Sequence, residues 1–203
     1  MSVTPAPAMS LLDQRASTRV QRSYPVKAMI LAGVLALQTV YFTGVISSDD
    51  MSYLAPALDA RDGLMTFPVD VKAYDCHCFA RVVYWKMVQV VMTLLPASPW
   101  AMGLPSMLAS FVSLLLIYRI AATLWDRTTG LVAMALGGVV PLSICNASVS
   151  VPDPVAGAFA WMGVCLIVTS LLSGRAEKLM PWWKGVLAGA LIAAGYNAKE
   201  VVA

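Results

Sequence analysis

Hydrophobic residues along the chain gather in long runs and do not alternate with polar ones. Five runs stand out, and each is long enough for a helix of about 20 residues that crosses a bilayer. The pattern predicts an all-α polytopic membrane protein with about five transmembrane helices. The runs are residues 28–46, 104–125, 131–149, 155–172 and 185–203.

Residues 79–96 are ambiguous, because Arg81 and Lys86 interrupt an otherwise apolar stretch. If this segment crosses the membrane, the basic loop at 174–184 falls on the external face, against the rule that cationic loops stay inside. If it lies along the outer interface as an amphipathic helix, that loop becomes cytoplasmic. The second arrangement satisfies every short loop. We therefore expect five spans plus one interfacial helix in the first external loop.

Composition agrees with a membrane protein. The 203 residues are 59% hydrophobic and only 12% charged, and the mean hydropathy is +0.74. A soluble domain carries about 25% charged residues. No glycine-rich phosphate loop and no basic, aromatic stretch typical of nucleic-acid binding is present, so we expect membrane lipids and no nucleic acid as partners.

The distribution of charge orients the chain. Residues 1–27 carry four cations against Asp13, whereas residues 47–80 carry six acids against Arg61 and Lys72. The positive-inside rule places the first segment in the cytoplasm and the second outside. We expect residues 1–27 to be a cytoplasmic tail without a cleaved signal peptide, and residues 28–203 to form the transmembrane domain.

Acidic and basic side chains converge at the external surface in this arrangement. Asp49 and Asp50 follow the first apolar run, and Asp153 lies between two later ones; Arg81 and Lys199 supply cations. Cations can hold an anionic phosphate that is also the leaving group. A carboxylate can take the proton of an attacking hydroxyl or amine. The pattern favours group transfer from a lipid-linked phosphate.

Several motifs resemble those of glycosyltransferase-C enzymes, in particular the aminoarabinose lipid A transferases and the protein mannosyltransferases. Residues 49–55, Asp-Asp-Met-Ser-Tyr-Leu-Ala, resemble the acidic motif of the first external loop. Residues 81–85 resemble the basic, aromatic interfacial segment, and residues 124–131 resemble the turn before the third helix. Residues 151–154, Val-Pro-Asp-Pro, resemble the second acidic motif, and residues 195–199 resemble the helix that ends in Thr-Lys-Gly. The likeness spans residues 28–203.

The resemblance implies an inverting transfer of a sugar from a polyprenyl-phosphate donor to a lipid, glycan or protein acceptor on the external face. It implies Asp49 as general base with Asp50 in support, and Asp153 as the residue that positions the acceptor. Arg81 and Lys199 would contact the donor phosphate. It implies no cofactor, and a bacterial inner membrane as the location.

Two observations favour an alternative: the last apolar run has no polar tail after it, and Glu200 follows Lys199 where the family usually has Gly. A second departure from the family pattern is Ser52, which stands where some relatives carry a basic residue. Family members are also longer, so we expect this chain to hold the N-terminal part of such an enzyme. The alternative function is a non-catalytic transmembrane subunit, derived from a transferase and bound to protein partner subunits.

Plainer roles for the same residues stay open. The pair Asp49-Asp50 can cap a helix, and Asp153 can serve a turn between prolines. Arg81 can extend to lipid headgroups, and Lys199 can pair locally with Glu200. For the segment 75–78, Asp-Cys-His-Cys, we expect no metal site, because structural zinc sites prefer Cys-x2-Cys spacing and a second cluster.

Overall fold

The computed structural model is a bundle of helices. It describes residues 11–43, 57–59, 61–63, 81–96, 98–173 and 180–199, with the side chains of the first helix described from Tyr24 onward. The helices are α1 (Leu11–Val40), α3 (Val82–Leu94), α4 (Pro99–Leu124), α5 (Arg127–Val139), α6 (Pro141–Ala147), α7 (Asp153–Ser173) and α8 (Trp182–Lys199).

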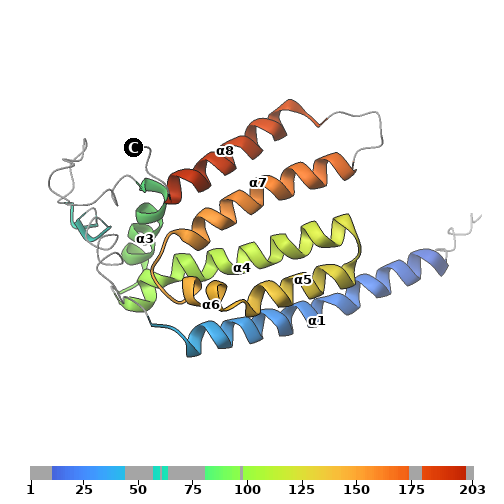
Figure 1. Ribbon diagram of the computed structural model, residues 1–203, viewed down its shortest axis with the longest axis horizontal. Coiled ribbons are helices and arrows are strands. Elements are labelled where there is room, and N and C mark those ends of the chain that lie inside the picture. Colours follow the sequence, from blue (N-terminus) through green and yellow to red (C-terminus); the bar gives the residue numbers. More distant parts are fainter. Residues whose placement is uncertain are drawn as a thin grey trace, which may run out of the picture.

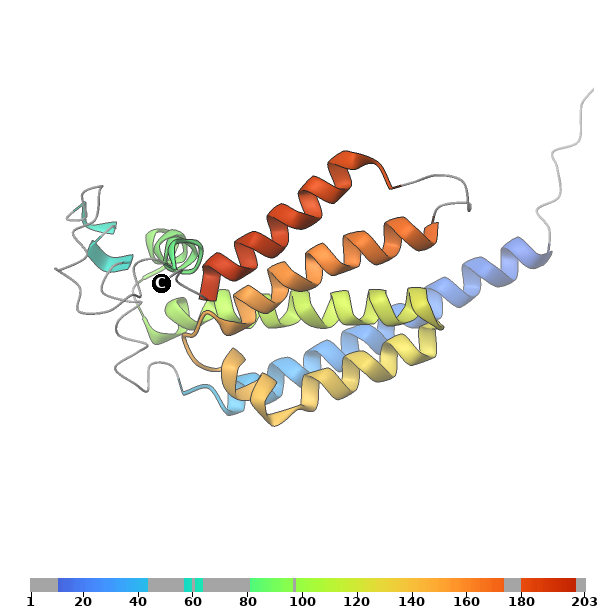
Figure 2. The same cartoon turned by 45° about the horizontal axis from the view of Figure 1, so that its top comes forward.

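Five of these helices run along the long axis of the bundle, and α3 lies across one end (Figures 1 and 2). We call this the α3 end. It also holds the start of α7 and the finish of α8, whereas the turn between α4 and α5 lies at the opposite end (Figure 1). The helix α7 packs most extensively against α8, and next against α4.

The prediction of an all-α membrane protein is confirmed. Both α4 and α7 are long and apolar enough to cross a membrane, and α5 and α6 together can form a third, bent span. The apolar part of α1, Tyr24–Val40, is a shorter apolar helix. That α1 and α8 also cross, which would give five spans, stays a prediction.

The expectation of one continuous helix over residues 131–149 is wrong. The segment breaks between α5 and α6, which meet at an angle of 65°. Pro141 is the cause, since proline has no backbone N–H and disfavours helical geometry in the residue before it. Val140 accordingly has extended backbone, with φ −61° and ψ 123°.

The first helix is also longer than the apolar run from which it was predicted. It begins at Leu11, inside the segment expected to be a polar tail, and continues through Pro25 to Val40. Helical backbone needs no apolar side chains, and Leu, Arg and Gln all favour it. The run 28–46 therefore indicated the apolar part of α1 and not its beginning.

The ambiguous segment 79–96 forms α3, which has only 13 residues. A helix of that length extends about 20 Å, which is less than the roughly 30 Å of a hydrocarbon core. It buries Tyr84, Trp85, Val88 and Met92 against the end of the bundle. Its length and its position across the bundle (Figures 1 and 2) agree with an interfacial helix.

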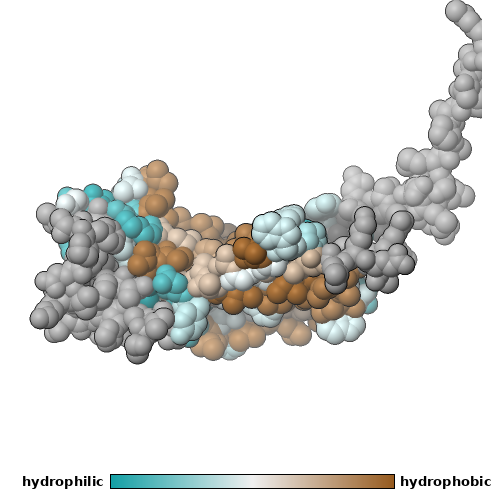
Figure 3. Space-filling model, turned by 90° about the horizontal axis from the view of Figure 1, so that it is seen from above, coloured by the Kyte–Doolittle hydropathy of each residue, from teal (hydrophilic) through white to brown (hydrophobic). Residues whose placement is uncertain are grey.

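Large apolar side chains cover the outside of the bundle between its ends. Leu136 is 61% exposed and Val186 is 62% exposed. Figure 3 shows apolar residues along the middle of one face, and hydrophilic residues gathered near the α3 end. An apolar surface of this extent suits contact with lipid.

Candidate functional site

An acid–base pair at the α3 end forms the centre of the candidate site. Asp153 is the first residue of α7 and Lys199 is the last residue of α8. The Lys199 Nζ atom lies 2.7 Å from Oδ1 of Asp153, and the side chains are 48% and 37% exposed. The structure therefore brings together two of the predicted site residues and leaves both accessible to a ligand.

Two glycines allow α7 and α8 to approach closely enough for this pair to form. A Cβ atom on Gly163 would lie 2.9 Å from the carbonyl oxygen of Ala188, and one on Gly195 would lie 2.8 Å from that of Ala156. Small residues at such crossings are typical of helices that pack in a membrane. The tight contact near Gly195 holds the last turn of α8 beside the first turn of α7.

The positions of the two charges also suit the helices that carry them. A carboxylate at the beginning of a helix and an ammonium group at the end of one both interact favourably with the helix dipole. Asp153 lies in the first turn of α7, and Lys199 in the last turn of α8. The helix dipoles thus favour both charges, and the exposed atoms of the pair can contact a polar substrate.

A buried hydrogen-bond network fixes the loop that precedes Asp153. The Tyr84 hydroxyl lies 2.9 Å from Oγ of Ser150 and 3.4 Å from Oγ of Ser106. Ser106 Oγ donates to the carbonyl oxygen of Val151 at 2.7 Å, and Ser150 Oγ donates to that of Met102 at 3.3 Å. These bonds join α3, α4 and the loop before α7, so they set where α7 begins.

Arg81 occupies the N-cap of α3, three residues before the anchored Tyr84. Its carbonyl oxygen accepts the backbone N–H of Tyr84 at 3.0 Å, and its Nε atom is buried. Both ribbon views place the beginning of α3 beside the end of α8 (Figures 1 and 2), and the two helices are in contact. The element that carries Arg81 therefore adjoins the acid–base pair.

The remaining predicted site residues lie outside the described residues. These are Asp49 and Asp50, and the segment 75–78 lies outside them as well. Within the described ranges, no group of three or more His, Cys, Asp or Glu side chains could hold a metal ion. The roles assigned to Asp49, Asp50, Asp153, Arg81 and Lys199 stay predictions.

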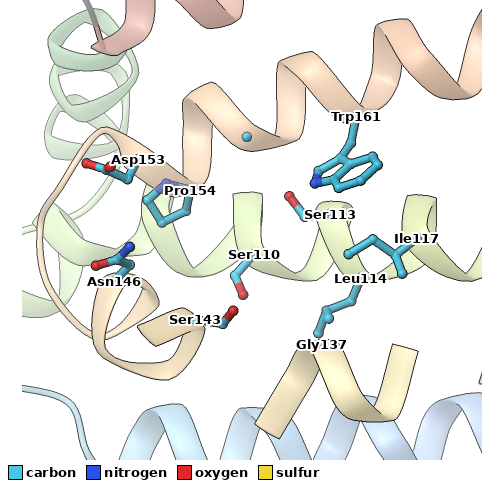
Figure 4. A pocket seen from close by; sticks show the side chains of 11 residues that line it. Ser110, Ser113, Leu114, Ile117, Gly137, Ser143, Asn146, Asp153, Pro154 and Trp161 are labelled. Carbon is cyan, nitrogen blue, oxygen red and sulfur yellow. The ribbon is translucent and has the colours of Figure 1, made fainter. Parts of the chain in front are cut away.

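A groove runs into the bundle from Asp153. It has a volume of about 320 Å³, and its walls come from α4, from both halves of the bent pair α5–α6, and from α7. Figure 4 shows the side chains that line it. They are Ser110, Ser113, Leu114, Ile117, Gly137, Ser143, Asn146, Asp153, Pro154, Gly157 and Trp161.

Sequence reasoning missed the residues of the network and of the groove. Serines recur at positions 106, 110 and 113 of the apolar helix α4, a spacing of three or four that puts them along one side. Polar groups in a membrane span usually face the bundle interior or a cavity. That spacing was the available signal, but the partners of these serines lie on other helices.

The fold and the acid–base pair are those of an all-α membrane protein with charged and polar side chains at one end of its helix bundle. A family profile described as dolichyl-phosphate-mannose-protein mannosyltransferase matches residues 81–203. Because the match covers more than half of the chain, the chain belongs to this family, and it is a membrane glycosyltransferase of the C type. No curated protein and no solved structure matches it.

Proposed function

We propose that this protein moves a sugar from a polyprenyl-phosphate donor to an acceptor at the external membrane surface, with inversion at the sugar carbon. The observation that supports this most is the exposed pair of Asp153 and Lys199 at the α3 end, inside the segment that matches the family. Lipid-linked donor and polar acceptor have to meet at the interface. We assign residues 1–27 to a cytoplasmic tail and residues 28–203 to the transferase domain, in a bacterial inner membrane.

The orientation is supported by the charges at the two ends. At the opposite end, the described charged side chains are cationic with one exception, Asp126. Cationic residues at short loops favour the cytoplasmic side. The α3 end would then be external. The cations at the opposite end are Lys27, Arg119, Arg127 and Lys184.

The proposed step is a direct displacement. A hydroxyl or amine of the acceptor attacks the sugar carbon while Asp49, supported by Asp50, accepts its proton. The bond between that carbon and the phosphate oxygen breaks, and its electrons leave with the polyprenyl phosphate. Arg81 and Lys199 stabilise the charge on the departing phosphate. Asp153 positions the acceptor, and its bond to Lys199 places the acceptor and donor subsites next to each other.

Replacement of the proposed base tests this function. We expect Asp49→Asn to lower sugar transfer in proteoliposomes by about 10²–10⁴-fold, the usual contribution of a general base. Asp62→Asn is a matched control, because Asp62 lies in the same acidic segment but pairs with Arg61 at 2.7 Å. Undiminished transfer by the Asp49 variant would remove this residue from the base role. A stable protein partner together with no donor binding would favour the non-catalytic subunit instead.

A further inference from the structure

The groove beside Asp153 has a graded lining. At the α3 end its walls are polar, with Asp153 and Asn146. The serines follow in the middle, with Ser113 next to the far part, and the far part is apolar (Figure 4). The serines are Ser110, Ser143 and Ser113, and the apolar residues are Leu114, Ile117 and Trp161. From Asp153 to Trp161 is two turns of α7, or about 12 Å along the helix. A lining that changes from polar to apolar along its length matches a molecule with a polar head and an apolar tail.

Ser110 is oriented to donate a hydrogen bond into this groove. The carboxamide of Gln38 on α1 donates to Oγ of Ser110 at 2.9 Å, and Gln38 is only 1% exposed. The hydroxyl oxygen of Ser110 therefore acts as an acceptor toward α1, and its hydrogen makes no bond within the described part of the chain. A hydroxyl with an unused donor on the wall of a membrane groove favours an uncharged polar ligand.

The charge of the lining decides between kinds of head group. Among the residues that line the groove, Asp153 carries the only charge, and its partner Lys199 is not part of the lining. A phosphate entering the groove would meet no cation on its walls, because Lys199, which neutralises Asp153, lies outside the lining, and a buried charge without a partner is unfavourable. A hydroxyl or amino group can instead donate to the carboxylate, to Asn146 and to the serines.

From these observations we infer that the groove binds the acceptor. The acceptor is a membrane amphiphile whose head carries hydroxyl groups, and the part of that head inside the groove has no phosphate. This inference rests on the proposed function and narrows its acceptor to a lipid. The amphiphile enters from the bilayer between α4, α7 and the bent pair, its tail at Trp161 and its head at Asp153. The donor phosphate stays on the Arg81 and Lys199 side of the carboxylate.

Photolabelling in phosphatidylcholine nanodiscs tests the inference without any need for turnover. The probe is dodecyl glucoside with a diazirine in its alkyl chain. We expect adducts on the peptides that contain Ser113–Ile117 of α4 and Gly157–Trp161 of α7, competed by unlabelled dodecyl glucoside and not by dodecyl phosphate. Labelling of the groove does not require sugar transfer, so the adducts are expected even if no transfer is detected. The inference and the proposed function can therefore be contradicted independently.

Two glycines on neighbouring helices give a matched pair of variants. Gly157 lines the groove and Gly189 on α8 does not, and a Cβ on either residue meets no atom within 4 Å. Gly157→Leu puts a side chain into the groove and should lower the adduct yield by about tenfold, whereas Gly189→Leu should leave it unchanged. Asn146→Leu, which keeps the number and branching of the side-chain heavy atoms but removes the polar groups, should lower it severalfold.

Three results would overturn the inference. The first is an adduct yield that Gly157→Leu and Gly189→Leu affect equally, which would place the probe elsewhere. The second is equal competition by dodecyl phosphate, which would contradict the uncharged head group. The third is full labelling of Asn146→Leu, which would show that the polar wall does not contact the head.

Discussion

The two ends of the bundle are held together in different ways. At the α3 end, hydrogen bonds join residues far apart in the sequence, as between Tyr84 and Ser150 or between Ser148 and the carbonyl of Gln38. At the opposite end, the side-chain hydrogen bonds of the described residues are local, such as the bond from Thr129 N–H to Asp126 at 2.8 Å. A long-range contact at that end is Lys27 over the ring of Tyr118, with Nζ 3.8 Å from the ring centroid.

The hydrogen bonds at the α3 end fix several helices relative to one another, whereas those at the opposite end stabilise single turns. A network of buried hydroxyl groups costs free energy when any member is lost, because the remaining partners stay buried. The α3 end carries such a network directly behind Asp153. The comparison predicts that substitutions at the α3 end disturb activity and stability more than equivalent ones at the opposite end.

The largest effect is expected from a pair of lysines, one at each end. Lys199→Gln keeps a polar side chain and removes the charge that the proposal assigns to the donor phosphate. Sugar transfer should fall by about a hundredfold, as is typical when one electrostatic contact to a developing charge is lost. Lys184→Gln, at the opposite end, should retain full transfer. The assay is single-turnover transfer in proteoliposomes, and equal rates for both variants would contradict the comparison.

Close approach of α7 and α8 provides the next test. Gly195→Leu places a Cβ 2.8 Å from a backbone oxygen of α7, so the helices must separate, at a cost of about 2 kcal/mol. Gly189→Leu on the same helix has open space and should be close to neutral. Thermal unfolding in detergent measures the difference. If the two variants unfold at the same temperature, close packing does not position the acid–base pair.

A smaller loss is expected in the buried network. Tyr84→Phe removes the hydroxyl that lies 2.9 Å from Ser150 and leaves buried oxygen atoms without that partner, which costs about 1 kcal/mol. Tyr196→Phe is the control, because Tyr196 is 56% exposed on α8. Chemical denaturation compares the two. A Tyr84 variant as stable as the control would show that the network contributes nothing to the α3 end.

The smallest effect is expected in the pH dependence of stability, from a carboxyl group at the opposite end. The backbone N–H of Thr129 donates to Asp126 and lowers the pKa of that carboxyl. A lowered pKa in the folded state gives stability above the unfolded-state pKa of about 3.9, and this stability is lost as the pH falls through the folded-state pKa. Asp126→Asn should therefore unfold at a slightly lower temperature than the original chain at pH about 7, and this difference should shrink as the pH falls below the unfolded-state pKa. If the difference in unfolding between the two proteins grows on acidification, the lowered pKa of Asp126 is contradicted.

The sequence predicted those parts of the fold that depend on local hydrophobicity. Long apolar runs placed α4 and α7, and the distribution of cations among the short loops favoured an interfacial helix at residues 79–96, where the structure has α3. The break at Val140 was missed, although Pro141 was visible, because a run of apolar residues was given more weight than one proline. A proline ends or kinks a helix even where the surrounding residues favour its continuation.

The site could be predicted only in part, because its geometry depends on contacts between helices and not on local hydrophobicity. Charge rules placed Asp153 and Lys199 on one side of the membrane, but their direct contact depends on how α7 crosses α8 at Gly163 and Gly195. The network around Tyr84 and the groove each need several elements in their final arrangement. No pattern within one segment of sequence contains that information.

The most direct test of the proposed site is the side of the membrane on which its carboxylates lie. The four native cysteines are replaced by alanine, and single cysteines are introduced by Asp49→Cys, Asp153→Cys and Arg127→Cys. A membrane-impermeant maleimide applied to intact cells should label the first two variants, and should label the third only after permeabilisation. If positions 49 and 153 react from opposite sides of the membrane, sugar transfer at a shared external site is contradicted.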